Sequence, residues 1–227
     1  MHPDVFVNVI KQILFLSAFT YGLVVMIKRK HPLYFRLLFF GVGCFLLENM
    51  YYLANYICSG GWASDFSFAL FGAGGCYAFM LSANFVLSEL ITSDEIKKHS
   101  SARIIGHIAP ILLLLIFFYG INFWASTQES IQGSIISILV VLLSKIAAFP
   151  AGYYHLRNLV SNDNSKYTKS LRLCNMMVLC VIFTDFISDL LYTIGRMYEA
   201  SAIGIFLPLF LLGMMVTADK GVQKWEM

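Results

Sequence analysis

The sequence contains little charge. Only 13% of its 227 residues are Asp, Glu, Lys or Arg, whereas soluble proteins average about 25%. In contrast, 59% of the residues are apolar and the mean hydropathy is +0.73. The chain is therefore predicted to be an integral membrane protein with the lipid bilayer as its main partner. Because membrane spans would use almost every residue, we expect residues 1–227 to form a single domain that binds no nucleic acid.

Several common signatures of membrane enzymes and metal sites are also missing. The sequence has no HExxH or GxSxG motif, and its five cysteines show neither CxxC nor Cys/His spacing. The last apolar segment has no lysine near its middle, where a retinal Schiff base would form. We therefore expect no metal, no cofactor and no disulfide framework.

Seven apolar segments are each about 20 residues long or longer, which is the length that a helix needs to cross a hydrocarbon core of about 30 Å. The first is not predicted to be a signal peptide, because no basic region precedes it. The fold class is accordingly all-α, a polytopic transmembrane bundle of seven helices. The predicted spans are Val5–Ile27, Leu33–Ile57, Phe66–Ile91, Ile104–Ala125, Ile131–Leu156, Leu171–Ile194 and Ser201–Ala218.

Lys and Arg side chains gather on one side of these spans. They follow the first, third, fifth and seventh segments, whereas the opposite side has only Arg196, with Lys11 near the membrane edge. By the positive-inside rule, the N-terminus is outside and the C-terminus is cytoplasmic. We predict a multi-pass protein of the bacterial cytoplasmic membrane. The basic residues are Lys28, Arg29, Lys30, Arg36, Lys97, Lys98, Arg103, Arg157, Lys166, Lys169, Arg172, Lys220 and Lys224.

Two segments share a short pattern. The second contains FLLENMY and the sixth contains FISDLLY, which align Glu48 with Asp189. The segments that follow contain SAN and TAD at their inner ends. A 3+1+3 pseudo-repeat would explain both pairs, as in small carriers that bind solutes at the repeat interface, although two hydrophobic helices can also resemble each other by chance. Gly72, Gly74 and Gly75 additionally predict close helix packing in the third segment.

Asp185 and Asp189 are four residues apart in an otherwise apolar segment, so they share one helix face. Tyr192 and Arg196 continue the same stripe. A carboxylate within a bilayer costs a few kcal/mol and usually faces a bundle interior or a cavity. This stripe is therefore the first candidate for a functional site.

Counting about 1.5 Å per residue from each segment's middle puts Glu48, Lys145 and Asp185 at one depth. Asp189 lies about 6 Å farther out by the same count. If the helices turn these groups inward, the groups form one binding site. The predicted site residues are Glu48, Lys145, Asp185, Asp189, Tyr192 and Asn55.

Three carboxylates and one lysine cannot all be ionised cheaply in a low dielectric, so at least one acid should be protonated or paired with Arg196. Such a site can exchange protons or bind a small solute, a cation or a lipid headgroup, which favours transport or sensing. Two alternatives are a structural Lys145–Asp185 ion pair and a non-catalytic subunit with a membrane protein partner. His155 is expected to be an interfacial histidine, and Ser82 and Asn84 to make packing hydrogen bonds.

The acids in the second and sixth segments, Leu47-Glu48 and Ser188-Asp189, resemble those of the YhhN-type lysoplasmalogenase family. Members of that family are small polytopic membrane enzymes that cleave the vinyl-ether bond of lysoplasmalogens. The resemblance implies that Glu48 and Asp189 would be catalytic acid and base residues of a membrane-embedded lipid hydrolase. The sequence departs from the family at Asn84, where a histidine would be expected, and in having one span fewer. It also looks similar to other seven-span bacterial membrane proteins.

Overall fold

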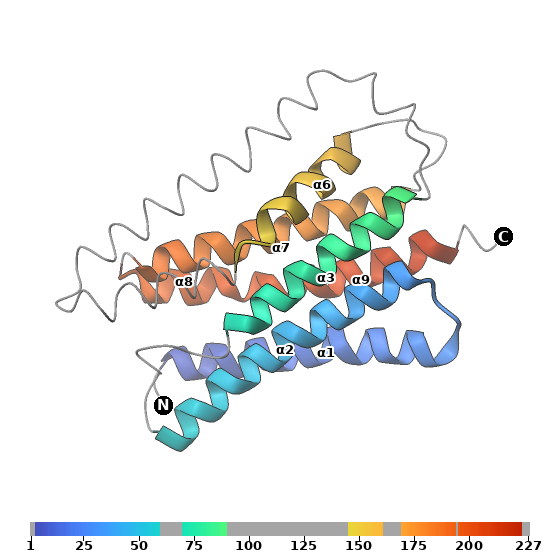
Figure 1. Ribbon diagram of the computed structural model, residues 1–227. Helices are drawn as coiled ribbons and strands as arrows, with labels where there is room; N and C mark the ends of the chain where they lie inside the picture. The colour runs from blue at the N-terminus through green and yellow to red at the C-terminus, as the bar shows by residue number, and fades with distance from the viewer. Residues whose placement is uncertain (1–2, 60–69, 90–144, 161–168, 194, 224–227) are drawn as a thin grey trace.

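The computed structural model describes residues 3–59, 70–89, 145–160, 169–193 and 195–223. Every regular element within these ranges is a helix and none is a strand, so the predicted all-α class is confirmed for this part of the chain (Figure 1). The predicted span Ile104–Ala125 and the first half of Ile131–Leu156 lie outside the described residues. The helices are α1 (Pro3–Lys28), α2 (Leu33–Ser59), α3 (Leu70–Glu89), α6 (Ala148–Val160), α7 (Lys169–Thr193), α8 (Met197–Gly204) and α9 (Phe206–Gln223).

Among the described residues, four stretches are long and apolar enough to cross a membrane: Val5–Lys28, Leu33–Cys58, Lys169–Tyr192 and Met197–Gly221. The apolar part of α3, Phe71–Val86, is shorter. Many large apolar side chains point away from the protein core, which lipid tolerates and water does not. Examples are Phe6, Ile13, Leu47 and Phe183, each at least 55% exposed. This is a membrane-embedded helical protein.

The last predicted span, Ser201–Ala218, is longer than expected and is divided into α8 and α9 at Ile205. Pro208 explains the break, because proline has no N–H to donate to the carbonyl of Gly204 and its ring crowds that carbonyl. Pro150 acts in the same way at the start of α6. The helix begins at Ala148, and the preceding residues Ile146 and Ala147 form a turn.

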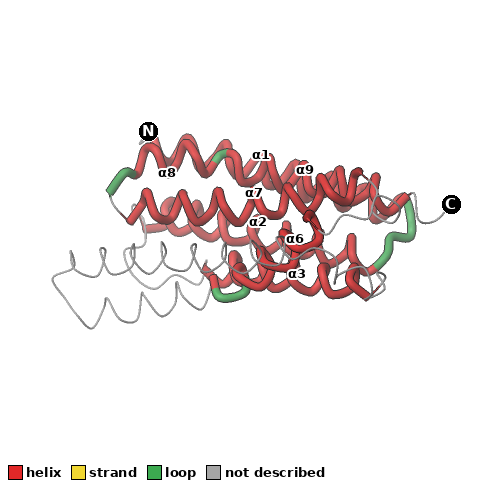
Figure 2. The backbone as a smooth tube through the Cα atoms, turned by 90° about the horizontal axis from the view of Figure 1, so that it is seen from above, coloured by secondary structure: helices red, strands yellow, loops and turns green. Residues whose placement is uncertain are grey.

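Helices α2 and α7 each pack on several neighbouring helices. α2 contacts α1 and α3, while α7 contacts α6, α8 and α9. Between these groups, α1 packs on α9 and α3 packs on α6 (Figures 1 and 2). One hydrophobic core includes residues of α1, α2, α3, α6, α7 and α9. Its fully buried members include Phe35, Leu38, Val42, Met80, Val178, Val181, Leu211 and Met214.

Glycines bring α2 and α3 close together, as the small-residue face of the third segment predicted. A Cβ atom on Gly72 would lie only 2.7 Å from the backbone oxygen of Cys44, and one on Gly41 would lie 3.3 Å from the backbone oxygen of Cys76. No larger residue fits at Gly72 unless the two helices separate. This close approach sets the position of Glu48, one turn after Cys44.

Candidate functional site

Lys145 is a lysine inside the protein core, with only 2% of its surface exposed. It occupies a helical position just before α6, and the turn formed by Ile146 and Ala147 separates it from Ala148, where α6 begins. Its ammonium nitrogen lies 5.7 Å from the ring centroids of both Tyr77 and Phe186. Aromatic faces attract a cation, but a buried ammonium group also needs negative partners.

Those partners are the two acids of α7. The ammonium of Lys145 forms ion pairs with Oδ2 of Asp185 and, at 2.9 Å, with Oδ2 of Asp189. The hydroxyl of Tyr77 on α3 donates a further hydrogen bond to Oδ2 of Asp185. The i, i+4 spacing of the two acids therefore does bring both onto one face, where they hold the same lysine.

Glu48 borders this group from α2 but is bonded differently. Its Oε2 atom is buried and has no hydrogen-bond partner. It faces Gly72, since a Cβ atom on Gly72 would lie 2.5 Å from its Cβ and 3.1 Å from Oε2. Glu48 is also within electrostatic range of Lys145 and of the two acids of α7. One carboxylate of the group is thus without a direct partner.

Lys11 on α1 is a second lysine near these acids. It was expected near the membrane edge, yet the structure turns it toward α8. A Cβ atom on Gly204 would lie 3.2 Å from its ammonium nitrogen and 3.5 Å from the hydroxyl of Ser188. It is within electrostatic range of Glu48 and of the α7 acids.

We define the ion cluster as Lys11, Glu48, Tyr77, Lys145, Asp185 and Asp189. Two lysines and three acids give it a formal charge of 2 − 3 = −1 when all five are ionised. Sequence reasoning did not include Tyr77 or Lys11 in the site. Both residues reach the cluster through the rotation of their helices, which depth counting does not give.

Three other residues considered in the sequence analysis, two of the predicted stripe and Asn55 on α2, make none of the cluster contacts given above. Tyr192 is 56% exposed. Asn55 is half-buried and lies two turns beyond Glu48 on α2. Arg196, predicted as a partner for one of the buried acids, instead pairs at 3.1 Å with Glu199, and both side chains are largely exposed. The suggestion that Arg196 neutralises a buried acid is therefore wrong.

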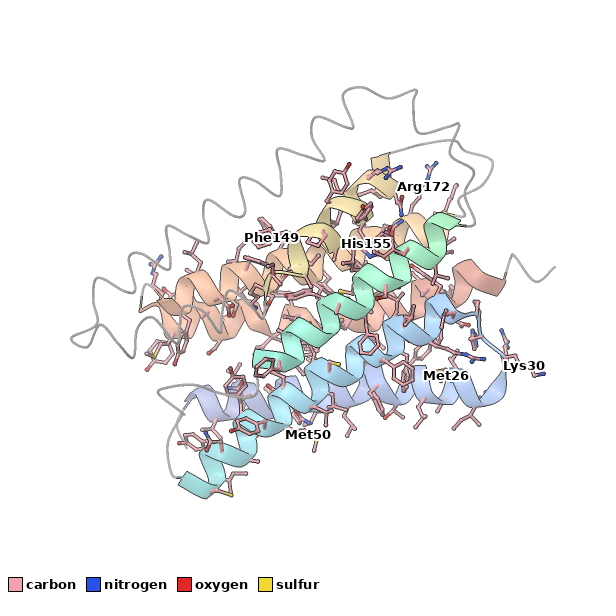
Figure 3. All side chains as sticks on the ribbon, viewed as in Figure 1. Met26, Lys30, Met50, Phe149, His155 and Arg172 are labelled. Atoms are coloured by element: carbon pink, nitrogen blue, oxygen red, sulfur yellow. The ribbon has the colours of Figure 1, made fainter. Side chains whose placement is uncertain are left out.

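A second polar group lies farther along α3 and α6 and nearer the start of α7. His155 was expected to be interfacial, but it is completely buried between these helices (Figure 3). Its Nδ1 atom lies 2.7 Å from Oδ1 of Asn175, and its Nε2 atom lies 3.2 Å from the backbone oxygen of Met80. The interfacial assignment is wrong because the buried face of α6, which includes Ala148 and Ala151, also includes His155.

Asn84 on α3 and Asn158 on α6 are buried as well, with 0% and 8% exposure. Neither amide atom of Asn84 has a hydrogen-bond partner, so the predicted packing hydrogen bonds of Asn84 are not made. Ser82 is exposed and bonds to the carbonyl of Ala78 in its own helix. We define the amide layer as Asn84, His155, Asn158 and Asn175.

A third group lies at the end of the bundle that holds the α1–α2 turn. Tyr21 donates a hydrogen bond of 3.3 Å to Asp219, and Nε2 of His31 lies 3.9 Å from the same carboxylate. The His31 ring packs against Phe35 in a tilted arrangement, with ring centroids 4.5 Å apart. These contacts join the α1–α2 turn to the end of α9.

In the described part of the chain, no set of three or more His, Cys, Asp or Glu side chains is arranged to hold a metal ion. All five cysteines are free thiols. Comparisons with protein-family models, curated proteins and solved structures gave no match.

Proposed function

We propose that the protein is a seven-span membrane protein that binds a small, positively charged solute or ion at the ion cluster, in transport or sensing. The N-terminus would be outside and the C-terminus cytoplasmic, as the distribution of Lys and Arg predicts for a bacterial cytoplasmic membrane. The α1–α2 turn supports this orientation, because it carries Lys28, Arg29 and Lys30.

The main support is the carboxylate of Glu48. A buried carboxylate oxygen without a hydrogen bond is unfavourable, and proteins usually compensate such a group with a partner. Lys145 is already held by Asp185 and Asp189, so Glu48 is the acid that remains available. A single cation or ammonium group at Glu48 would also bring the formal charge of the cluster from −1 to zero.

Exposure within the cluster suggests how a solute would reach it. The side chain of Lys145 is 2% exposed and that of Asp185 is 11% exposed, but that of Asp189 is 39% exposed. Asp189 lies one turn farther along α7 than Asp185, toward the end predicted to be outside. We therefore infer that a solute enters the cluster past Asp189.

Two helix interruptions border the cluster, which also favours a binding role. Lys145 precedes the Pro150 interruption of α6, and Lys11 faces Gly204 beside the α8–α9 break. Broken helices near mid-membrane are common at solute sites of transporters, because freed backbone groups can bind solutes there.

The packing of the helices supports the proposed 3+1+3 pseudo-repeat. Within each group of three, the middle helix contacts the other two: α2 with α1 and α3, and α7 with α6 and α9. Between the groups, the first helix of each packs on the last helix of the other. Glu48 and Asp189 would then be equivalent acids that face one site at the repeat interface.

The proposal is tested by thermal unfolding of the purified protein with amines, alkali cations or lysolipids. A ligand that binds only the folded state stabilises it by about 2.7 kcal/mol at 100 times its Kd. We expect an amine or a cation to raise the Tm of the wild type but not that of Glu48→Gln. Glu199→Gln is the matched control, because it makes the same change in an exposed ion pair.

Two outcomes would contradict the proposal. If no amine or cation raises the Tm, or if Glu48→Gln responds like the wild type, Glu48 is not a cation receptor and the cluster is better explained as a structural ion network. Release of a lipid product from lysoplasmalogens, lost in Glu48→Gln, would instead support the hydrolase alternative. In that reaction Glu48 and Asp189 would act as the general acid and the general base.

A further inference from the structure

The amide layer contains more polar atoms than its own members can satisfy. Asn84, His155 and Asn175 have 0% exposure and Asn158 has 8%, so bulk water does not reach them in this conformation. Yet Nδ2 and Oδ1 of Asn84, Nδ2 of Asn158 and Nδ2 of Asn175 all lack a hydrogen-bond partner. Four amide atoms in one region of the core are therefore unsatisfied.

Rotating an amide group does not remove this deficit. If the Asn175 amide is turned over, its nitrogen can donate to Nδ1 of His155 while Nε2–H of His155 donates to the carbonyl of Met80. In that arrangement the oxygen of Asn175 loses its partner instead. Asn84 and Asn158 are unchanged in either case.

The unsatisfied atoms lie on helix faces that meet. His155 and Asn158 continue the buried stripe of α6 that begins at Ala148, and Asn84 lies one turn after Met80, whose carbonyl contacts His155. Helices α3 and α6 pack on each other and run in the same general direction (Figure 1). Asn84 and Asn158 therefore lie at similar depth, each one turn beyond the His155 contact.

We propose that the amide layer is a binding site for internal water. The four side chains include no carboxylate, ammonium or guanidinium group, so the layer offers an ion no countercharge. Amide nitrogens donate and amide oxygens accept, and water can satisfy both because it makes about three hydrogen bonds inside proteins. Bridging waters would therefore join Asn84, Asn158 and Asn175.

The position of the amide layer suggests that its water hydrates the core next to the ion cluster. This inference rests on the proposed function. Met80 is one turn from Tyr77 on α3, and Tyr77 is hydrogen-bonded to Asp185 of the ion cluster. Water in the amide layer would thus hydrate the part of the protein core that lies between the ion cluster and the end of the bundle predicted to be cytoplasmic.

Radiolytic hydroxyl labelling of the full-length protein tests the water site directly. A short X-ray pulse converts water to hydroxyl radicals, which oxidise the nearest reactive side chains, and Met is readily oxidised. Met80 and Met215 are both completely buried, but the carbonyl of Met80 contacts His155 of the amide layer, whereas Met215 packs against Gly22 of α1. We expect Met80 to be oxidised several-fold faster than Met215.

Replacement of Asn84 by Leu should lower the oxidation rate of Met80 to that of Met215 and leave Met215 unchanged. Asn158→Leu provides the same test if Asn84→Leu does not fold. Equal rates for Met80 and Met215 in the wild type would overturn the water site. Glu48→Gln separates the two proposals, because fast oxidation of Met80 should persist in that variant even if no solute binds at Glu48.

Discussion

The ion cluster and the amide layer lie about two helical turns apart on α3, at Tyr77 and Asn84, and they stabilise buried polar atoms by different means. In the ion cluster, Lys145 is held by two acids and Tyr77 supports one of them. In the amide layer, the two His155 ring nitrogens contact Oδ1 of Asn175 and the carbonyl of Met80, and four amide atoms have no partner. A buried charge requires a countercharge, whereas an unpaired amide is a smaller penalty that a neutral molecule can relieve. The two regions should therefore respond in opposite ways when polar groups are removed.

Lys145→Met should have the largest effect, because it leaves Asp185 and Asp189 buried without a cation. Removal of one partner of a buried ion pair typically costs about 3–5 kcal/mol. We expect a loss of this size in the free energy of unfolding, measured by chemical denaturation in detergent. A second change, Asp185→Asn, made in the Lys145→Met background should recover part of it. Wild-type stability in Lys145→Met would show that the ion cluster does not depend on its lysine.

Gly72→Ala should have an intermediate effect at the edge of the ion cluster. The new Cβ atom would lie 2.5 Å from Cβ of Glu48 and 2.7 Å from the carbonyl of Cys44, so α2 and α3 would have to separate. Overpacking of this kind costs about 1–3 kcal/mol. Gly152→Ala, on α6, is the matched control, since its nearest neighbour would be 3.7 Å away. Equal Tm values for the two variants would contradict the close α2–α3 contact.

Asn158→Leu should have the smallest effect on stability. Its amide nitrogen makes no hydrogen bond to another protein group that the substitution could break, and an apolar group of similar size removes a buried polar atom. We expect a Tm equal to or slightly above that of the wild type. By contrast, Asn49→Leu would break the 2.7 Å hydrogen bond to Gln12 and lower the Tm. Strong destabilisation by Asn158→Leu would mean that Asn158 has partners other than water.

Hydropathy predicted the helices well, because the length of an apolar run directly reflects the thickness of the bilayer. The ends of α1, α2 and α7 lie within two residues of the predicted spans. The meeting of Lys145 with Asp185 also followed from depth counting. Depth counting gives a level along the membrane normal, however, and does not give the rotation of a helix about its axis.

Helix rotation explains the residues that sequence reasoning missed or misjudged. Tyr77 and His155 face the core because of the helices packed around them, and neither has a distinguishing sequence motif. Pro208 in the last apolar segment predicts an interruption of that helix, and the structure has one at Ile205. The backbone of Ile205 keeps helical angles, with φ −64° and ψ −30°, so α8 and α9 still form one apolar stretch, Met197–Gly221.

The interruption at Ile205 has a mechanical consequence. A helical rod with one missing hydrogen bond bends most easily at that point. The part before the bend, α8, is packed on α7 and α1 and accepts a hydrogen bond of 3.0 Å from Ser188 at the carbonyl of Ala200. Gly204 is the last residue of α8 and lies against the ammonium group of Lys11. A change in the bend would therefore move Lys11 relative to the acids, which links the angle between α8 and α9 to the charge balance of the ion cluster.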